Sequence, residues 1–217
     1  MKKIDYKAIY LGAGLLAAFT LWTLLLGVID IRPIGPRGSS VGFATINLTV
    51  HRLIGSNINL YIITDWLGLV PIAVALGFAI LGLCQLISRR SLLKVDHSIL
   101  VLGVFYIAVI AAYLFFEYTA INYRPVLIDG FLEASYPSST TLLTLCVMPT
   151  AAMQLTQRVK RTHLATALNV IIIAFTAFMV IGRLISGVHW ITDIIGGILL
   201  SLGLVSLYRG FDRVKVD

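Results

Sequence analysis

The chain has 217 residues, of which 59% are hydrophobic and only 12% are charged, with a mean hydropathy of +0.94 and a net charge of +7. A soluble domain carries about 25% charged residues, so this composition excludes an ordinary soluble protein. It also argues against a nucleic-acid partner, because the basic residues stand in short clusters at the ends of apolar stretches. Such clusters are typical of membrane proteins, and a weak attraction to anionic lipid headgroups is the expected effect.

Apolar stretches of about 20 residues recur along the chain, and each is long enough to cross a bilayer as a helix. We expect six such spans, at Ile9–Ile29, Leu60–Ile87, Ile99–Phe116, Ser138–Leu155, Ala165–Ile185 and Trp190–Tyr208. The pattern predicts an all-α membrane protein with six transmembrane helices. Residues 1–217 are expected to form a single domain, since no repeat, low-complexity tract or long linker divides them.

The positive charges predict the orientation of these spans. One set of span ends carries 12 of the 17 lysines and arginines, namely Lys2, Lys3, Lys7, Arg89, Arg90, Lys94, Arg158, Lys160, Arg161, Arg209, Arg213 and Lys215. The opposite set carries the other five, Arg32, Arg37, Arg52, Arg124 and Arg183. Lysine and arginine accumulate in cytoplasmic loops, so both termini are predicted to be cytoplasmic. The first span is too long for a signal-peptide core and lacks an evident cleavage site, so we expect it to be retained.

The segment between the first two spans begins with the turn formers DIRPIGPRGSS. Residues at helical spacing then predict a short helix lying in the membrane interface: Val41, Ala44, Thr45, Leu48 and Arg52. We interpret His51 and Arg52 as a solvated pair rather than as headgroup contacts. Asp65 is expected to be a helix-end acid near water, and Trp66 an anchor in the aromatic belt of the membrane.

Two later external segments, residues 121–143 and 182–197, place ionisable residues close to the membrane. Such residues are unfavourable at membrane depth and by default indicate function. One of them alone would be an ordinary polar residue at the end of a span. Arg124 and Arg183 together with His189 and Asp193 instead predict a common site.

The spacing of these residues favours phosphate chemistry. His189 and Asp193 are four residues apart and would share one face of a helix. The carboxylate can then accept the ring N–H, fix the tautomer and leave the other nitrogen as a nucleophile or base. Gly187 indicates a helix break before the last span, and Ser138 and Ser139 stand at the start of the fourth. Two guanidiniums and two helix N-termini predict a phosphate site.

These residues resemble the motifs of the phosphatidic acid phosphatase type 2 superfamily, in its membrane branch. The family pattern is K-x6-R-P, then P-S-G-H, then S-R-x5-H-x3-D. Its counterparts here are Glu117 with Arg124-Pro125, then Pro137-Ser138-Ser139-Thr140, then Gly182-Arg183 with His189 and Asp193. The resemblance is close from Phe116 to Asp193 and extends over the whole chain by architecture.

The resemblance implies a six-span helical bundle in the cell membrane of a bacterium, with an active site at the external face. It implies a lipid phosphate or diphosphate substrate and no metal or other cofactor, and the sequence offers no acidic cluster suited to Mg²⁺. His189 would attack phosphorus and form a phosphohistidine, and Asp193 would orient it. The phosphoryl oxygens would be bound by Arg124, Arg183, Ser138 and Ser139.

The chain departs from this family pattern at four positions. Glu117 replaces Lys, Ser139 replaces Gly, Thr140 replaces His and Gly182 replaces Ser. The change at Glu117 makes the pocket less positive. The change at Thr140 removes the usual general acid, a contribution of typically about 10²–10⁴-fold in rate. The nucleophile side of the site is therefore intact, whereas the leaving-group side is not.

Three hypotheses fit this asymmetry. In the first, the leaving group needs no proton because it is a stable phosphate anion, so an isoprenoid diphosphate is the favoured substrate of a membrane phosphohydrolase. A lipid phosphotransferase using the same phosphohistidine belongs to this class. In the second, a protonated Glu117 is a substitute acid. In the third, the chain binds or transports phospholipid or isoprenoid phosphate headgroups without turnover. The retained His189–Asp193 pair favours an enzyme over a binder.

Overall fold

The computed structural model describes residues 4–212, so Lys2, Lys3, Arg213 and Lys215 of the predicted basic ends lie outside the described range. This part of the chain is helical and contains no strand. Its α-helices are α1 (Tyr6–Leu26), α2 (Ala44–Ile54), α3 (Ile58–Leu67), α4 (Leu69–Arg89), α5 (His97–Thr119), α6 (Ser139–Arg158), α7 (Thr162–Ile185) and α8 (Ile191–Phe211), and two short 3₁₀ helices lie at Pro36–Gly38 and Leu92–Lys94.

Five segments are long and apolar enough to cross a membrane: α1, α3 and α4 taken together, α5, α7 and α8. They coincide with five of the predicted spans to within a few residues, as expected of a multi-pass membrane protein. The sixth predicted span is α6, which is as long but more polar. It contacts α4, α5, α7 and α8, and 10 of its 20 residues are buried. Because α6 faces other helices rather than lipid, it can be more polar, and its crossing of the membrane stays a prediction.

The second span is interrupted in a way that the apolar pattern did not predict. Helix α3 ends at Leu67 and α4 begins at Leu69, with Gly68 between them. Pro71 explains the interruption, because proline has no backbone N–H and its ring clashes with the carbonyl four residues earlier, which belongs to Leu67. The short α3 is thereby set apart from α4 as a separate element.

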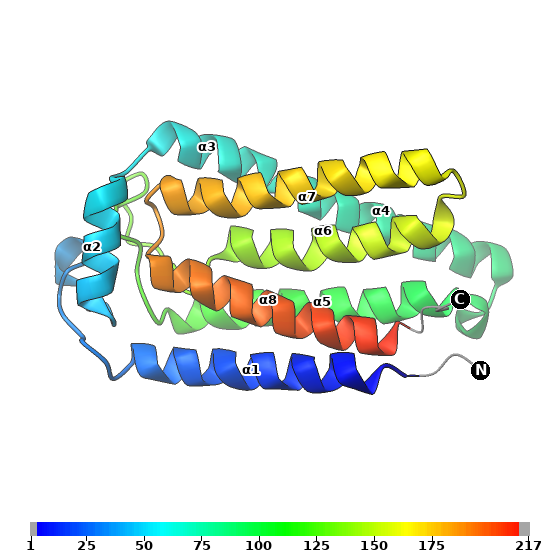
Figure 1. Cartoon of the computed structure of the whole chain (residues 1–217), viewed down its shortest axis with the longest axis horizontal. Helices are drawn as coiled ribbons and strands as arrows, with labels where there is room; N and C mark the ends of the chain where they lie inside the picture. The colour runs from blue at the N-terminus through cyan, green and yellow to red at the C-terminus, as the bar shows by residue number, and fades with distance from the viewer. Residues whose placement is uncertain (1–3, 213–217) are drawn as a thin grey trace.

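Helix α2 lies across one end of the bundle (Figure 1), which confirms the predicted short helix. Buried Asn47 attaches α2 to the start of α8, since its Nδ2 donates to the carbonyl of Gly42 at 2.8 Å and to Oγ1 of Thr192 at 2.9 Å. The interpretation of His51 and Arg52 as a solvated pair holds for Arg52, which is exposed, but not for His51, whose partly buried ring packs edge-on against Trp190 with centroids 5.5 Å apart.

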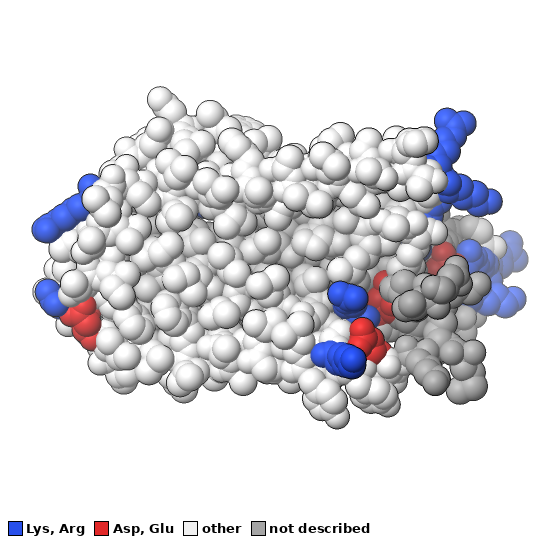
Figure 2. Space-filling view, in the orientation of Figure 1, with Lys and Arg blue, Asp and Glu red and all other residues white. Residues whose placement is uncertain are grey.

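The two ends of the bundle differ in charge. The start of α1 and the end of α8 lie at the same end, opposite α2 (Figure 1). Lysine and arginine side chains gather at that end in Figure 2 and are few near α2. The counterparts of the family motifs come from elements that meet near the other end, which α2 covers (Figure 1).

Candidate active site

The segment between α5 and α6 folds back on itself and supplies Arg124. Backbone hydrogen bonds join Arg124 to Glu133 at 3.0 Å and Ser135 to Asn122 at 2.9 Å. The turn is made by Asp129 and Gly130, both with positive φ, an arrangement for which Asp-Gly is a favoured pair. This narrow loop was not predicted, although the Asp-Gly pair was its signal in the sequence.

The turn between α7 and α8 supplies His189. Gly187 has φ +64°, and a Cβ there would lie 1.9 Å from the carbonyl oxygen of Gly55. Glycine is therefore required both by the backbone conformation and by the close approach of the α2–α3 connection. The predicted break at Gly187 is confirmed, and His189 stands two residues before the first residue of α8.

The surroundings of His189 fix its tautomer and its charge. Nδ1 lies 3.1 Å from the carbonyl oxygen of Ser135, which can only accept, so Nδ1 carries the proton and Nε2 has the free lone pair. Burial, followed by the positive charges of Arg124 and Arg183, lowers the pKa of His189 well below 6.5. The imidazole is therefore neutral at neutral pH.

Asp193 is close to His189 but is not the hydrogen-bond acceptor that the spacing predicted. Its Oδ2 lies 3.7 Å from Nδ1 of His189, and the carbonyl of Ser135 is nearer. The carboxylate instead accepts the backbone N–H of Trp190 at 2.9 Å and Nδ2 of Asn122 at 3.3 Å. Asp193 thus fixes the start of α8 and places its carboxyl group beside the ring.

Both arginines are buried and each is paired with a carboxylate. Nε of Arg124 lies 3.0 Å from Oε2 of Glu133, and Nη2 of Arg183 lies 3.3 Å from Oδ1 of Asp65. The expectation for Asp65, a helix-end acid near water, is thus incomplete, because its partly exposed carboxylate is bound to a guanidinium. The charges of both arginines act on the pKa of His189, which places the three groups in one neighbourhood.

Four nitrogens of this cluster are buried without a hydrogen-bond partner in the described part of the chain, and one of them, Nε of Arg124, lies in the ion pair with Glu133. The three that have neither kind of partner are Nη1 of Arg124, Nε of Arg183 and Nε2 of His189. Buried polar groups are normally paired, so unpaired ones require an explanation. Two guanidinium donors beside an imidazole lone pair match a phosphoryl group, which offers oxygens to the donors and phosphorus to the lone pair.

The remaining predicted residues surround this cluster. Glu117 and Ser139 line a pocket with His189, and the pocket volume of about 10 Å³ is enough for one water at most. The hydroxyl oxygen of Ser138 accepts a hydrogen bond from Oγ1 of Thr141 at 3.0 Å. The backbone N–H of Ser138 donates to the backbone carbonyl of Asp193 at 3.1 Å. Ser138 therefore joins the start of α6 to α8.

Thr140 is buried in the first turn of α6 and is not among the residues that line this pocket. Within residues 4–212 no group of three or more His, Cys, Asp or Glu side chains is arranged to hold a metal ion. Sequence reasoning missed Asn122, Ser135 and Glu133, which act through the fold of the loop, and Tyr61, which lies far away in the chain.

Comparisons with known proteins agree with this architecture. The PAP2 superfamily matches residues 12–214 of the chain. The fold is similar to the crystal structure of a transmembrane PAP2-type phosphatidylglycerolphosphate phosphatase from Bacillus subtilis, with a TM-score of 0.59 and 20% identity over 96% of this chain and 98% of that one. A comparison with curated protein sequences gave no match. Because the family match covers nearly the entire sequence, the chain belongs to the PAP2 superfamily.

Proposed function

We propose that the chain is a membrane phosphohydrolase that cleaves a lipid phosphate through a phosphohistidine at His189. The observation that carries this proposal is the set of three unpaired buried nitrogens on Arg124, Arg183 and His189. Membership of the PAP2 superfamily and the likeness in fold to a lipid phosphate phosphatase support it. The substrate that we favour is an isoprenoid diphosphate.

The reaction has two steps. Nε2 of His189 attacks phosphorus, an N–P bond forms, and the P–O bond to the leaving group breaks with its electron pair on that oxygen. A water then forms an O–P bond while the N–P bond breaks and its electron pair returns to Nε2, and the protons of that water leave with the phosphate or pass to solvent. Arg124 and Arg183 would neutralise charge on the phosphoryl oxygens, and Asp193 would stabilise the imidazolium that develops. Side chains around the small pocket must move to admit the phosphoryl group.

The preference for a diphosphate follows from the leaving-group side. No histidine stands at Thr140, and a threonine hydroxyl is a poor acid near neutral pH. An alkoxide that leaves a monophosphate needs a proton, whereas a phosphate that leaves a diphosphate is already a stable anion. Glu117, which lines the pocket with His189, is the substitute acid of the competing hypothesis.

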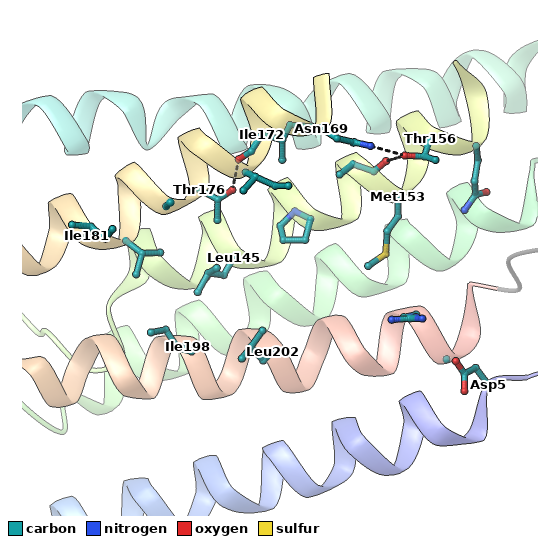
Figure 3. A pocket seen from close by; sticks show the side chains of 18 of the residues that line it. Asp5, Leu145, Met153, Thr156, Asn169, Ile172, Thr176, Ile181, Ile198 and Leu202 are labelled. Atoms are coloured by element: carbon teal, nitrogen blue, oxygen red, sulfur yellow. Dashed lines mark hydrogen bonds between the residues drawn. The ribbon is translucent and has the colours of Figure 1, made fainter. Parts of the chain in front are cut away.

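A large groove offers a place for the hydrocarbon chain. It has a volume of about 1100 Å³ and lies between α6, α7 and α8 (Figure 3). Ile181 and Ile198 line one part of it. Ile181 lies two residues before Arg183 in α7, and Ile198 lies five residues after Asp193 in α8. Most of its other lining residues are apolar, which suits an isoprenoid or acyl chain.

We further propose that six spans cross a bacterial cell membrane, with cytoplasmic termini and the active site at the external face. The charge asymmetry between the two ends of the bundle supports this orientation (Figure 2). A non-catalytic headgroup carrier is the second candidate function, since Asp65 and Glu133 already neutralise the two arginines. The third, a lipid phosphotransferase, would use another acceptor in place of water.

Phosphate release from the purified chain tests the proposal. Isoprenoid and acyl lipids are supplied as matched mono- and diphosphates, and a His189→Ala variant is the control. We expect release from diphosphates by the parent and none by the variant. Headgroup binding without release from any substrate would favour the carrier, and transfer to an added lipid alcohol would favour the phosphotransferase.

A further inference from the structure

Helix α3 presents three consecutive contacts to Arg183. Nη1 of Arg183 lies 3.3 Å from Oγ1 of Thr64 and 3.5 Å from the carbonyl oxygen of Tyr61, and Nη2 lies 3.3 Å from Oδ1 of Asp65. Positions 61, 64 and 65 share one helical face, so the contacts form a continuous surface. Arg183 is 1% exposed and depends on this surface for its partners.

The ring of Tyr61 also joins the two arginines of the site. The guanidinium carbon of Arg183 lies 4.9 Å from the ring centroid, and that of Arg124 lies 5.6 Å from it. Two like charges this close repel each other, and burial strengthens the repulsion. An aromatic face attracts cations, so Tyr61 offsets part of this repulsion for both groups.

The approach of α3 depends on a glycine beside Arg183. A Cβ at Gly182 would lie 2.9 Å from Cγ2 of Thr64, which is closer than packed atoms allow. Position 182 is also where the family motif has Ser and this chain has Gly. The departure at Gly182 thus makes the room that Thr64 occupies when its hydroxyl meets the guanidinium.

We propose that Tyr61, Thr64 and Asp65 are positioning residues for the phosphate site. They hold one side of the two guanidiniums, and this orients Nε of Arg183 and Nη1 of Arg124, the unpaired donors, for the oxygens of a phosphoryl group. Helix α3 is thereby a part of the binding site rather than only the first turns of a membrane span. The identity of the ligand as a phosphoryl group rests on the proposed function.

The test compares Tyr61→Leu with Tyr61→Phe in the purified full-length chain. Inorganic orthovanadate and phosphate are the probes, and their affinity is read from the rise in unfolding temperature with probe concentration and from inhibition of turnover. Loss of the ring should weaken binding of both probes by about tenfold, the size of a partly desolvated cation–π contact. The phenylalanine variant keeps the ring and should stay within about threefold of the parent.

A matched control lies on the other side of the same helix. Ile62 is 46% exposed, so Ile62→Ala should leave probe affinity unchanged. Equal affinities for the parent and Tyr61→Leu would overturn the proposal, as would an equal loss in Tyr61→Phe and Tyr61→Leu. A general defect in folding would instead lower the unfolding temperature without probe in all three variants.

A double-mutant cycle separates positioning from other effects of α3. Thr64→Val and Asp65→Asn should each weaken probe binding in the parent, and neither should do so after Arg183→Gln. Effects that persist without Arg183 would contradict the proposal. Probe binding does not require turnover, so a chain that binds phosphate through this surface but hydrolyses no lipid would refute the proposed function alone. A parent that binds neither probe would refute both.

Discussion

At the scale of single residues, His189 could act as the proposed nucleophile only while Nε2 is unprotonated. The carbonyl of Ser135 keeps the proton on Nδ1, and burial with two nearby guanidiniums disfavours a second proton. The low pKa of His189 is therefore a property of Arg124 and Arg183 as well as of the imidazole. The same charges that would bind the substrate also keep the nucleophile free.

This coupling predicts the pH dependence of the reaction. Because the pKa of His189 is lowered in the folded protein, the acid limb of kcat/KM should fall below pH 6.5. Removing a neighbouring positive charge should raise that pKa, so Arg124→Gln should move the limb to higher pH while it lowers the rate. Steady-state kinetics between pH 4 and 8 measure the position of the acid limb and the rate. A control substrate that does not titrate over this range excludes titration of the substrate as the cause of the shift.

Under the proposed mechanism, Glu117 and Thr140 would set the leaving-group preference. Thr140→His, alone or with Glu117→Lys, should raise monophosphate hydrolysis more than diphosphate hydrolysis, because only the former needs a proton. The double change should do more, since Glu117 shares the pocket with His189 and opposes an anionic headgroup. Initial rates on matched lipids check this expectation.

Equal efficiency of the parent on monophosphates and diphosphates would contradict this leaving-group argument and indicate Glu117 as the acid. Glu117→Gln should then be inactive. The amide of glutamine suits this test, because it keeps the size of the side chain and removes the carboxyl group that would donate the proton.

The motif residues could be predicted from the sequence, but their partners could not. His189, Arg124 and Arg183 stand out because ionisable groups are rare in apolar surroundings. The carbonyl of Ser135 has no such signal, since every residue has one. Tyr61 is one aromatic residue among many in apolar stretches, and only the folded chain places it over two guanidiniums.

At the scale of elements, the α7–α8 turn determines where His189 lies. Gly187→Ala should lower the free energy of unfolding by at least about 1–2 kcal/mol, because φ is positive and the new Cβ would overlap the carbonyl of Gly55. Phosphate release should fall with it, as the turn shifts His189. Gly77→Ala is the control, since nothing lies within 4 Å of a Cβ there. Thermal unfolding and activity assays are applied to both variants. A Gly187→Ala variant with the stability and the activity of the parent would contradict the role of the turn.

The apolar pattern predicted the helices well because five of the six expected spans are apolar runs of about 20 residues or more. It missed the break at Gly68, where one proline divides a run that is apolar throughout. It also missed the folded loop before α6, whose Asp129-Gly130 turn is a local signal inside a polar stretch. Both features matter for the site, since the first separates α3 and the second places Arg124 beside Glu133.

At the scale of the whole molecule, the orientation in the membrane can be tested by labelling. In a Cys84→Ala background, which removes the exposed thiol, cysteines at Gly38 and Asp129 should react with an impermeant reagent in intact cells. A cysteine at Ser91 should not, because it lies at the basic end of the bundle. Labelling at Ser91 without permeabilisation would contradict cytoplasmic termini and an external active site.

The proposed function as a whole depends on a covalent bond between His189 and phosphorus. The most direct measurement is to mix the purified chain with a lipid diphosphate carrying a radioactive terminal phosphate, to stop turnover in alkaline detergent and to recover the protein. We expect a label that is stable to alkali and lost in acid, as a phosphohistidine is, and none in His189→Ala. A label of the same amount in His189→Ala, or phosphate release by that variant at the parental rate, would contradict the account.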